Sequence, residues 1–517
     1  MESALIRALQ DPAVYPHPVD QVELIETHIS WVLLSGEHVY KIKKPVNLGF
    51  VDFSTLDKRR HYCLEELRLN RRHAADLYID VVALGGEEHA PIFGADEKVI
   101  EYAVRMHRFD TRLEFDRLLA NNQLKSEQVR ELGRQMAQLH GQAEVARPEG
   151  RFGSLEQVSF PMHDNLDTLA ELLPQSRQQQ IAMLRSWTDS ELQNSRSLIE
   201  LRFNQGFVRE CHGDAHLGNV TIFQGQVRLF DCIEFNEDLR WIDVINDLAF
   251  TVMDLHDRGA AALAWTLLDE YLTRTGDFEG VGLLRLYLVY RALVRAKVTA
   301  LQLEDQELAA KDRQKLTTEV NDYLDLARAW TQPTSPRLVI TVGVSGSGKS
   351  WLAERLLACC GMVRLRSDVE RKRLFDLDAE APSRSALSTG IYSREATEKT
   401  YETLLDIAET LLRYGYSVIV DATFVRRNQR TAFRDLASRL DMPFGLLHCH
   451  ADPAVLRERI RSRNAAGKDP SEAGLEVLDK QLQSFEPPSG DELDHTLTCN
   501  TDDAQTLERA RDWITSA

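Results

Sequence analysis

The sequence lacks any apolar run that approaches the roughly 18 residues a membrane helix needs. Its first residues also lack the basic stretch and the long apolar stretch of a secretory signal peptide. Cysteine is scarce: seven are scattered over 517 residues, odd in number and without a C-x-x-C pair, which argues against a disulfide framework or a zinc site. These absences predict a protein of the cytoplasm with reduced thiols and no membrane partner.

Positive charge is also in short supply. The chain has 62 Lys and Arg residues against 80 Asp and Glu residues, a formal net charge of −18. A protein that coats nucleic acid needs a positive surface field, so a nucleic-acid partner is not favoured, although a local basic patch leaves it open. With 43% hydrophobic and 27% charged residues and no low-complexity segment, the chain is typical of a globular protein of about three ~150-residue units.

The most informative motif is the stretch G-V-S-G-S-G-K-S at residues 343–350. A β-branched run precedes it and a run with helical spacing follows it, which is the order of a phosphate-binding loop. Lys349 would reach the β- and γ-phosphates, and the Ser350 hydroxyl would bind Mg²⁺. A Gly/Ser turn with a chance Lys-Ser pair is the alternative. The residues expected to hold the nucleotide are Gly343, Ser345, Gly346, Ser347, Gly348, Lys349 and Ser350.

The first third of the chain predicts a small strand-rich lobe joined to a helical lobe. Residues 1–26 are expected to form a short helix and a proline-punctuated loop, and residues 56–75 a helix that carries Glu65 and Glu66. The predicted strands are 29–34, 39–43, 78–84 and 99–106. After residue 106 the pattern becomes mostly helical, including a helix over 241–255 with Asp243 and Asp247 on one face.

A second chemical motif is C-H-G-D-A-H-L-G-N-V at residues 211–220, followed by two short apolar strands joined by a turn. Asp214 and Asn219 precede this hairpin and Asp231 follows it, so their side chains can converge at one end of a rigid support. One carboxylate could accept a proton from an attacking hydroxyl, and the others could offer oxygen ligands to Mg²⁺. A polar loop that only caps local turns is the alternative.

This motif resembles the catalytic loop of the aminoglycoside phosphotransferase family, which has a protein-kinase-like fold and carries His-Gly-Asp where protein kinases carry His-Arg-Asp. The resemblance covers residues 20–330. It implies that Asp214 is the catalytic base, that Asn219 and Asp231 are metal ligands, and that Met106 lies at the hinge between lobes. The strand lysine that holds the α- and β-phosphates would be Lys41, with Lys43 as the less favoured candidate. Its helical partner would be Glu66 or Glu65.

The sequence departs from this family pattern in two places. Residues 27–30 lack the glycines of a nucleotide-covering loop, and Asp231 is followed by Cys-Ile instead of Phe-Gly. No Ala-Pro-Glu follows, so a protein substrate is not expected.

Two prolines among polar residues at 331–336 break the helical pattern and predict a domain boundary, which divides the chain into residues 1–332 and 333–517. Beyond the boundary, strands alternate with helices, which predicts right-handed crossovers and a parallel sheet. The predicted strands are 338–342, 363–365, 417–420, 444–448 and 495–499. Ligands of such sheets bind at the carboxyl ends of the strands, where Asp368 and Asp421 stand.

This second part resembles the small P-loop kinases of the predicted-ATPase, zeta-toxin-like and polynucleotide-kinase-like group. The resemblance implies that Asp368 is the base and that Asp421 supports Mg²⁺. It also implies that residues 457–463 form a lid helix in which Arg459 and Arg463 face the transferred phosphoryl group. A solvated basic helix face is the alternative for that run.

The expected architecture is therefore an α+β, protein-kinase-like, two-lobe domain followed by an α/β P-loop NTPase domain with a parallel sheet. The expected function is a bifunctional phosphotransferase that uses ATP or GTP with Mg²⁺. The resemblance implies a small-molecule hydroxyl acceptor of the sugar, aminosugar or polyol class. A polynucleotide 5′-hydroxyl kinase in the second domain, or a non-catalytic nucleotide sensor in one of them, are the alternatives. The acceptors and the oligomeric state stay open.

Overall fold

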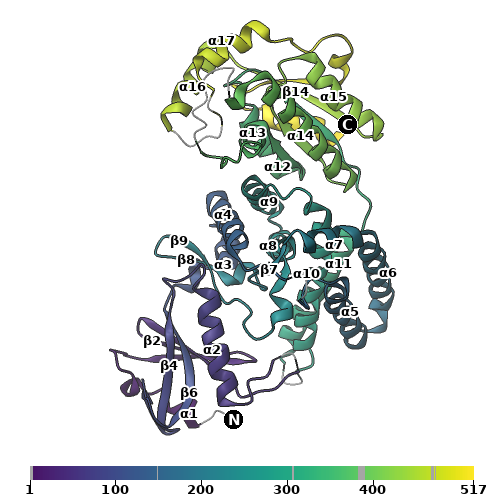
Figure 1. Ribbon diagram of the computed structural model, residues 1–517. Helices are drawn as coiled ribbons and strands as arrows, with labels where there is room; N and C mark the ends of the chain where they lie inside the picture. The colour runs from purple at the N-terminus through teal and green to yellow at the C-terminus, as the bar shows by residue number, and fades with distance from the viewer. Residues whose placement is uncertain are drawn as a thin grey trace. The chain divides into compact units, whose positions relative to one another are not determined.

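The computed structural model describes residues 4–49, 51–147, 150–305, 308–381, 390–466, 471 and 473–516. The chain divides into two compact units (Figure 1). The first unit combines Met1–Asn165 with Leu192–Asp254, and the second combines Leu166–Glu191 with Leu255–Ala517. Each unit contains one large β-sheet.

The large sheet of the first unit has six antiparallel strands in the order β1-β2-β3-β6-β4-β5. They are β1 Val22–Glu26, β2 Ser30–Ser35, β3 His38–Lys43, β4 Tyr78–Glu87, β5 Ala90–Phe93 and β6 Val99–His107. The four strands predicted in this region are confirmed. The expectation of a loop up to residue 26 is wrong, because β1 lies there as an edge strand. Its side chains are largely exposed, so the sequence shows no apolar alternation.

Alternate residues of β3 point to opposite faces of this sheet. Tyr40 and Ile42 join a core cluster with helix α1 (Ala4–Ala8). Val39 joins a cluster on the other face with Cys63 of helix α2 (Leu56–Asn70), which lies along the sheet in Figure 1. The residues Lys41 and Lys43 share the face of Val39, so both lysines are turned toward α2.

The rest of the first unit is mostly helical and carries two small sheets. Its main helices are α3 Phe115–Ala120, α4 Ser126–Gln142, α5 Leu155–Leu172, α7 Arg196–Asn204 and α8 Val244–Asp257, of which α5 and α8 continue into the second unit. The small sheets pair β7 (Val208–Glu210) with β10 (Trp241–Asp243), and β8 (Val220–Phe223) with β9 (Gln226–Leu229). The β8–β9 hairpin that the sequence predicts before Asp231 is confirmed.

The predicted helix over 241–255 is wrong at its start. Residues Trp241–Asp243 pair with β7 instead, and the Asp243 carboxylate accepts from the backbone N–H of Ile245. Asp243 binds the buried Arg202 guanidinium at 2.7 and 2.9 Å, whereas Asp247 lies on α8 and faces His140. The two aspartates therefore do not share one helix face, because strand pairing and local capping fix Asp243 before α8 begins.

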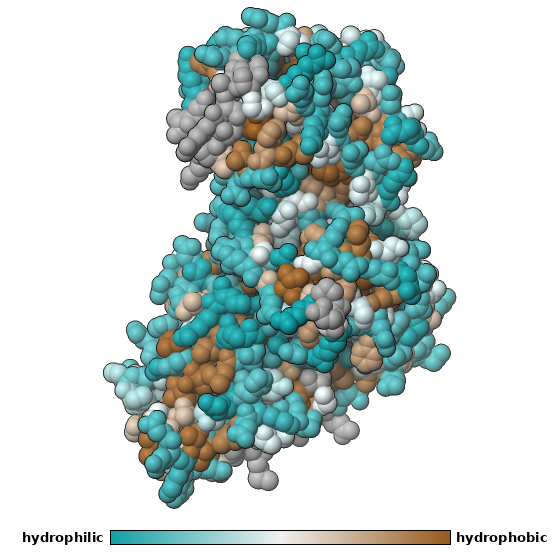
Figure 2. All heavy atoms as spheres, viewed as in Figure 1, coloured by the Kyte–Doolittle hydropathy of each residue, from teal (hydrophilic) through white to brown (hydrophobic). Residues whose placement is uncertain are grey.

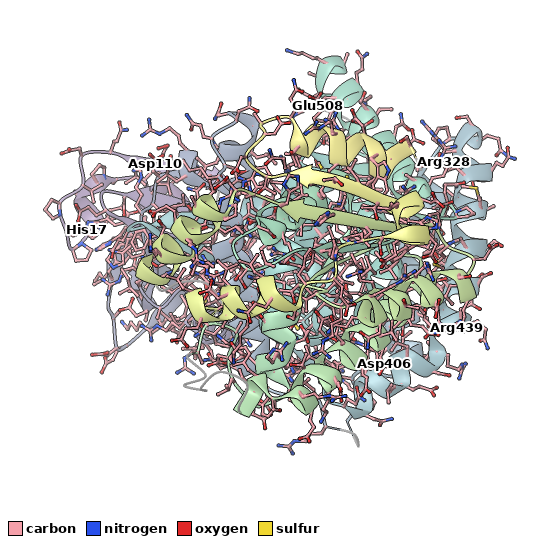
Figure 3. All side chains as sticks on the ribbon, turned by 90° about the horizontal axis from the view of Figure 1, so that it is seen from above. His17, Asp110, Arg328, Asp406, Arg439 and Glu508 are labelled. Atoms are coloured by element: carbon pink, nitrogen blue, oxygen red, sulfur yellow. The ribbon has the colours of Figure 1, made fainter. Side chains whose placement is uncertain are left out.

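The sheet of the second unit has five strands and is parallel, as the sequence predicts, and its strand order is β12-β13-β11-β14-β15. They are β11 Leu338–Val342, β12 Val363–Arg366, β13 Val418–Asp421, β14 Phe444–His450 and β15 Thr496–Asn500. The helices that follow the phosphate-binding loop are α12 Lys349–Cys360, α13 Ser367–Arg373, α14 Arg394–Arg413, α15 Arg427–Arg439, α16 Pro453–Ala466, α17 Leu475–Ser484 and α18 Thr506–Ser516. In Figure 3 the helix that carries Glu508 lies on one side of this sheet, and the helices that carry Asp406 and Arg439 lie on the other.

Helix α9 (Ala261–Thr275) belongs to the second unit and packs on this sheet domain. Helices α10 (Val281–Gln302) and α11 (Ala310–Trp330) belong to the same unit. Trp265 packs against the core cluster that holds Leu356 and Leu357 of α12. Asp269 accepts two hydrogen bonds from the buried Arg364 guanidinium, at 3.0 and 2.6 Å. Helix α9 is therefore tied to β12 and α12, which follow it at a distance of about a hundred residues in the chain.

Hydrophilic residues cover most of the face seen in Figure 2, with smaller apolar areas between them. In the part of the chain that the structure describes, no helix is long and apolar enough to cross a membrane.

Candidate active sites

The loop that carries Asp214 is fixed from below by the carboxylate of Asp247 on α8. This carboxylate accepts from the backbone N–H groups of His212 and Gly213 at 3.1 and 2.8 Å, and it lies 3.0 Å from a ring nitrogen of His140. Gly213 has a φ of +86°, and a Cβ there would meet the carbonyl oxygen of Leu239 at 2.8 Å. The loop therefore requires glycine at this position.

His212 connects this loop to the segment that carries Asp231. Its Nε2 lies 2.9 Å from the carbonyl oxygen of Phe230, which can only accept, so Nε2 carries the proton. Its Nδ1 then accepts the backbone N–H of Asp214 at 3.3 Å. Burial lowers the pKa of His212, in keeping with a neutral ring that fixes the backbone on both sides of the β8–β9 hairpin.

Asp214 and Asn219 lie side by side, as the sequence predicts. The Asn219 side-chain nitrogen donates to the carbonyl oxygen and to Oδ2 of Asp214, at 3.0 and 3.1 Å. The amide oxygen of Asn219 is therefore the atom that remains for a cation. The Asp214 side chain is 36% exposed, and Nε2 of His216 lies 3.5 Å from its Oδ2. This carboxylate is thus held in one orientation while part of it stays open to a ligand.

Lys41 and Asp231 meet opposite the Asp214 loop. Lys41 Nζ lies 3.0 Å from Glu66 Oε1 and forms an ion pair with Asp231. Asp231 has a φ of +63°, and its backbone N–H donates to the Tyr78 hydroxyl at 3.1 Å. Burial alone would lower the pKa of Lys41, but the carboxylates of Asp231 and Glu66 raise it well above its usual value. Lys41 is therefore charged before any nucleotide arrives.

The structure separates the two lysine candidates and the two glutamate candidates. Lys41 is 15% exposed and Lys43 is fully buried, with its Nζ 2.7 Å from Glu66 Oε2 and in an ion pair with Glu234. Glu66 thus faces both lysines, whereas Glu65 binds Arg68 on the surface of α2. Burial raises the pKa of Glu66, but the two lysines outweigh it and lower the value to about 2.

Met106, the predicted hinge residue, lies inside strand β6 with its side chain in the core cluster next to α2. The chain leaves this strand after His107. The turn predicted to lack a nucleotide-covering glycine is the β1–β2 turn, which is closed by Thr27: its hydroxyl accepts the backbone N–H of Ser30 at 2.9 Å and its backbone N–H donates to the Ser30 carbonyl.

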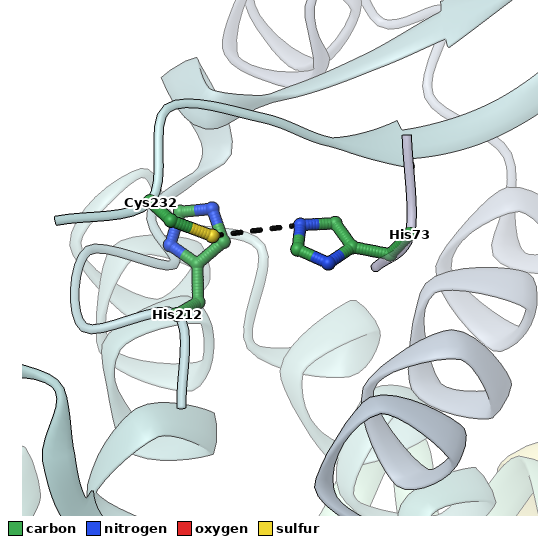
Figure 4. A group of neighbouring side chains, drawn as sticks. All are labelled: His73, His212 and Cys232. Atoms are coloured by element: carbon green, nitrogen blue, oxygen red, sulfur yellow. Dashed lines mark hydrogen bonds between the residues drawn. The ribbon is translucent and has the colours of Figure 1, made fainter. Parts of the chain in front are cut away.

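His73, His212 and Cys232 gather beneath this site (Figure 4). Cys232 Sγ lies 3.6 Å from Nε2 of His73. Three such side chains could hold a metal ion, but both ring nitrogens of His212 already make hydrogen bonds to the backbone. Burial raises the pKa of the Cys232 thiol, so the group behaves as a packed, neutral core element.

In the second unit, the phosphate-binding loop joins β11 to α12, and its glycines are required by their surroundings. Gly346 has a φ of +82°, and a Cβ there would lie 2.8 Å from the carbonyl oxygen of Leu456. Gly348 has a φ of +83°, and a Cβ there would lie 2.8 Å from Cβ of Thr501. Larger residues would thus push the loop away from α16 and β15.

A cavity of about 180 Å³ at this loop brings together most of the residues predicted for the second site. Those that line it are Ser345, Gly346, Gly348, Lys349, Ser350, Asp368, Asp421, Arg459 and Arg463. Gly343 and Ser347 are not among its lining residues: Gly343 donates its N–H to Thr423, and the buried Ser347 hydroxyl lies 3.5 Å from Lys349 Nζ. Both instead support the loop from behind.

The cations of this cavity are held mostly by backbone oxygens. Lys349 Nζ donates to the carbonyl oxygen of Val344 at 2.8 Å, and burial lowers its pKa although Asp421 and Asp368 oppose the shift. Arg459 binds Thr501, Asp502 and the carbonyl oxygen of Gly346, so it braces the loop. Arg463 donates to the carbonyl oxygen of Ala473, and its buried Nε has no hydrogen-bond partner in the described part of the chain, which omits residues 467–470 and 472.

Both sites offer oxygen ligands of the kind that Mg²⁺ prefers. In the first site these are the Asp231 carboxylate, which is 43% exposed, and the amide oxygen of Asn219. In the second site the Ser350 hydroxyl and the Asp421 carboxylate line one cavity. The residues therefore fit the metal that the sequence predicts.

Several residues of these sites were not found from the sequence. Arg366 lines the cavity 4.0 Å from Asp421 Oδ2, and its place two residues before Asp368 was the available signal. Gln481 accepts the backbone N–H of Ser345 at 2.7 Å across 136 positions of sequence, and Glu234 meets Lys43 across 191. No local pattern marks either contact.

Comparisons with known proteins match two parts of the chain. Residues 72–287 match the phosphotransferase enzyme family, and residues 338–488 match an AAA domain family. Uncharacterized proteins of Mycobacterium tuberculosis and Mycobacterium bovis are each 28% identical over 460 residues, which are 88% of this chain and 89% of theirs.

Two solved structures are similar at low identity. An amicoumacin kinase in complex with AMP-PNP, Ca²⁺ and Ami covers 62% of this chain and 92% of its own, with 14% identity and a TM-score of 0.39. A sugar kinase from Janibacter sp. covers 35% of this chain and 96% of its own, with 22% identity and a TM-score of 0.28. From the family matches, the chain contains a phosphotransferase-family domain followed by a P-loop kinase domain, and it is a kinase.

Proposed function

We propose that the protein is a bifunctional kinase in which each of two sites transfers the γ-phosphoryl group of ATP or GTP to a hydroxyl of a small molecule. Two observations support the proposal: Asn219 binds Asp214 and Lys41 pairs with Asp231 in the first unit, and Lys349, Ser350, Asp368 and Asp421 line one cavity in the second. This is the set of groups that phosphoryl transfer needs. We place the boundary between the two kinase domains at residues 332 and 333, in the segment between α11 and β11.

In the first site, Asp214 accepts the proton of the acceptor hydroxyl. The hydrogen bonds from Asn219 hold one carboxylate oxygen in place, which orients the base. Lys41 binds the α- and β-phosphates, and Glu66 keeps it extended toward them. Asn219 and Asp231 would hold Mg²⁺, which would supply the positive charge that offsets the charge on the phosphates. Asp231 is the carboxylate that would bind the metal. Its bond to the metal would free Lys41 to bind the nucleotide.

In the second site, Asp368 accepts the hydroxyl proton and Lys349 binds the β- and γ-phosphates. Among the residues that the structure describes, the Lys349 ammonium is held by the carbonyl oxygen of Val344 and by the Ser347 hydroxyl at 3.5 Å, so it can turn to a phosphate without leaving a carboxylate unpaired. Arg463, which lines the cavity, faces the transferred group, and Arg459 holds the loop in shape. Ser350 and Asp421 support the metal.

By analogy with the family that the first site resembles, the acceptors belong to the sugar, aminosugar or polyol class. The sequence shows no peptide-docking activation segment after Asp231, which argues against a protein substrate. All seven cysteines are free in the structure, which supports work in a reducing compartment, the cytoplasm.

A phosphoryl-transfer screen tests this proposal. The wild type, Asp214→Ala and Lys349→Ala receive γ-labelled ATP or GTP with sugars, aminosugars, polyols, nucleosides and 5′-hydroxyl oligonucleotides. We expect each variant to lose one class of labelled small molecule and to keep the other. Labelling of oligonucleotides alone, dependent on Lys349, would make the second site a polynucleotide kinase. Transfer that survives in both variants would contradict both site assignments.

A further inference from the structure

The Glu66 carboxylate is paired with two lysines. One lysine would be enough for the ion pair between an active-site lysine and its helical glutamate. Lys41 Nζ is 3.0 Å from Oε1 of Glu66, and Lys43 Nζ is 2.7 Å from Oε2. Lys43 is also paired with Glu234, and its Nζ lies 4.9 Å from the centre of the Phe53 ring. We call Lys43, Glu66 and Glu234 the Lys43 clamp. All three are buried, so the clamp is out of reach of a bound nucleotide.

The clamp joins segments that are far apart in the sequence. Lys43 comes from β3, Glu66 from α2, and Glu234 stands three residues after Asp231. The intervening Cys232 donates its backbone N–H to Asn70 at the end of α2, at 3.0 Å. The Asp231 backbone is therefore held on one side by the Tyr78 hydroxyl and on the other by α2 and β3.

Asp231 needs this support because its backbone has a φ of +63°. A residue other than glycine keeps such a conformation only where its surroundings fix it. The sequence offers no Phe-Gly after Asp231 to pack the segment against α2, and an ion pair stands in its place.

The clamp also balances charge during turnover. When Lys41 divides its charge between a phosphate and Glu66, the pairing on Oε1 weakens, and a buried carboxylate that is poorly paired is costly. Lys43 stays on Oε2, so Glu66 remains paired.

We propose that Lys43 and Glu234 are positioning residues of the first site: they hold Asp231 and Glu66 in place for Mg²⁺ and the nucleotide without touching either. The inference rests on the proposed function of that site. It assigns the two neighbouring lysines different tasks, with Lys41 as the nucleotide ligand and Lys43 as the anchor.

The test uses the full chain with Lys349→Ala, so that transfer by the second site is removed. Glu234→Gln changes one oxygen to an amide without changing volume, and it leaves two lysines facing two carboxylates. The matched control is Glu101→Gln, because Glu101 forms a buried ion pair with Arg59 of α2 at 2.8 Å, outside the nucleotide site. Calorimetry measures how much Mg²⁺ increases the affinity for AMP-PNP, and thermal unfolding measures stability.

We expect both variants to lower the unfolding midpoint, and only Glu234→Gln to weaken the Mg²⁺-dependent binding, by about 10-fold. Glu234→Asp, which restores the charge, should recover part of the loss. Equal, small effects of Glu234→Gln and Glu101→Gln on binding would overturn the proposal and leave the clamp a purely structural feature. Absence of Asp214-dependent transfer in the wild type would instead speak against the proposed function, since the calorimetric comparison does not depend on turnover.

The double variant Lys43→Met/Glu234→Gln provides a second test of the positioning role. Removal of both members leaves no unpaired buried charge, so this pair of substitutions should be more stable than Lys43→Met alone. We expect its Mg²⁺-dependent binding to stay reduced, because the segment after Asp231 is no longer tied to β3. Full recovery of that binding would contradict a positioning role.

Discussion

The two sites hold their phosphate-binding lysines in opposite ways. Lys41 of the first site lies between two carboxylates, and Lys349 of the second lies against a backbone carbonyl oxygen and a serine hydroxyl. Burial acts on both ammonium groups, but the net result differs: the pKa of Lys41 is raised well above its usual value, and the pKa of Lys349 is lowered. The same chemistry is therefore prepared by two electrostatic arrangements.

The difference shows which interactions fix the side chains and backbone of each site before the nucleotide binds. In the first site, ion pairs across the lobe fix the lysine and the metal ligand, and binding exchanges one partner for another. In the second site, the backbone of the glycine-rich loop is fixed by close contacts with α16 and with the residue after β15. The lysine there forms only weaker hydrogen bonds within the described part of the chain. Order comes from side-chain charge in the first case and from backbone packing in the second.

Loss of the catalytic base should have the largest effect and should be the same in both sites. Asp214→Asn and Asp368→Asn keep the shape of the side chain and remove the proton acceptor. We expect each to lower kcat of its own site by about 10²–10⁴-fold and to leave the other unchanged. Steady-state kinetics with the acceptor of each site measures this. A drop of less than threefold for either variant would remove that residue from the role of base.

Substitution of the lysines should separate activity from stability. We expect both Lys41→Met and Lys349→Met to reduce transfer by their own site by about 10²–10³-fold. Lys41→Met also removes a partner of Glu66, so it should lower the free energy of unfolding by about 1–3 kcal/mol. Lys349→Met removes a buried charge without a carboxylate partner, and its change should stay within about 1 kcal/mol.

Chemical denaturation of the two lysine variants, with Lys41→Arg and Lys349→Arg as charge-keeping controls, measures the difference. Equal decreases in the free energy of unfolding would show that the different partners of the two lysines do not affect stability.

The response to alkaline pH should differ between the sites. A lysine with a lowered pKa gives up its proton at a lower pH than one with a raised pKa, and the neutral amine no longer attracts phosphate. As the pH rises, Lys349 therefore loses its charge first, and kcat/KM for the nucleotide should fall earlier in the second site. This ratio reports the ionisation of the free enzyme. Lys349→Arg should remove the early fall, and coincident profiles would count against the contrast.

The smallest effect is expected at Glu65. Its carboxylate binds Arg68 on the surface of α2, 2.8 Å away, and contacts neither candidate lysine. Glu65→Gln should change transfer by less than about twofold, whereas Glu66→Gln should reduce it by more than tenfold because Glu66 faces both lysines. If the order were reversed, the assignment of Glu66 as the partner of Lys41 would fail.

Local patterns predicted the strands, the phosphate-binding loop and the parallel sheet. Asp214, Asn219 and Asp231 could be grouped because a short hairpin separates them, and hairpin geometry is readable from apolar runs and a glycine turn. Strand β1 was not predicted because an exposed edge strand shows no alternation of apolar and polar residues. Residues 241–243 were misassigned because pairing with β7, some thirty residues away, overrides a helical pattern.

The contacts that the sequence did not predict join residues that are far apart in the chain. Lys43 and Glu234 are far apart in the chain, and Glu234 reads as an ordinary charged residue until the fold brings it to β3. Arg459 was expected to face the phosphoryl group, and its contacts with Thr501 and Asp502 depend on where the chain after β15 passes. Only tertiary structure decides such contacts, since many alternative partners have the same residue type.

The packing of α9 on the sheet of the second unit has a practical consequence for anyone who wishes to produce the P-loop kinase alone. A fragment that begins at residue 333 would lack Asp269 and Trp265, so the Arg364 guanidinium would lose its carboxylate and one side of the α12 core would face water. The shortest fragment that keeps the phosphate-binding helix covered therefore begins before Ala261, well inside the region that the sequence assigns to the other kinase.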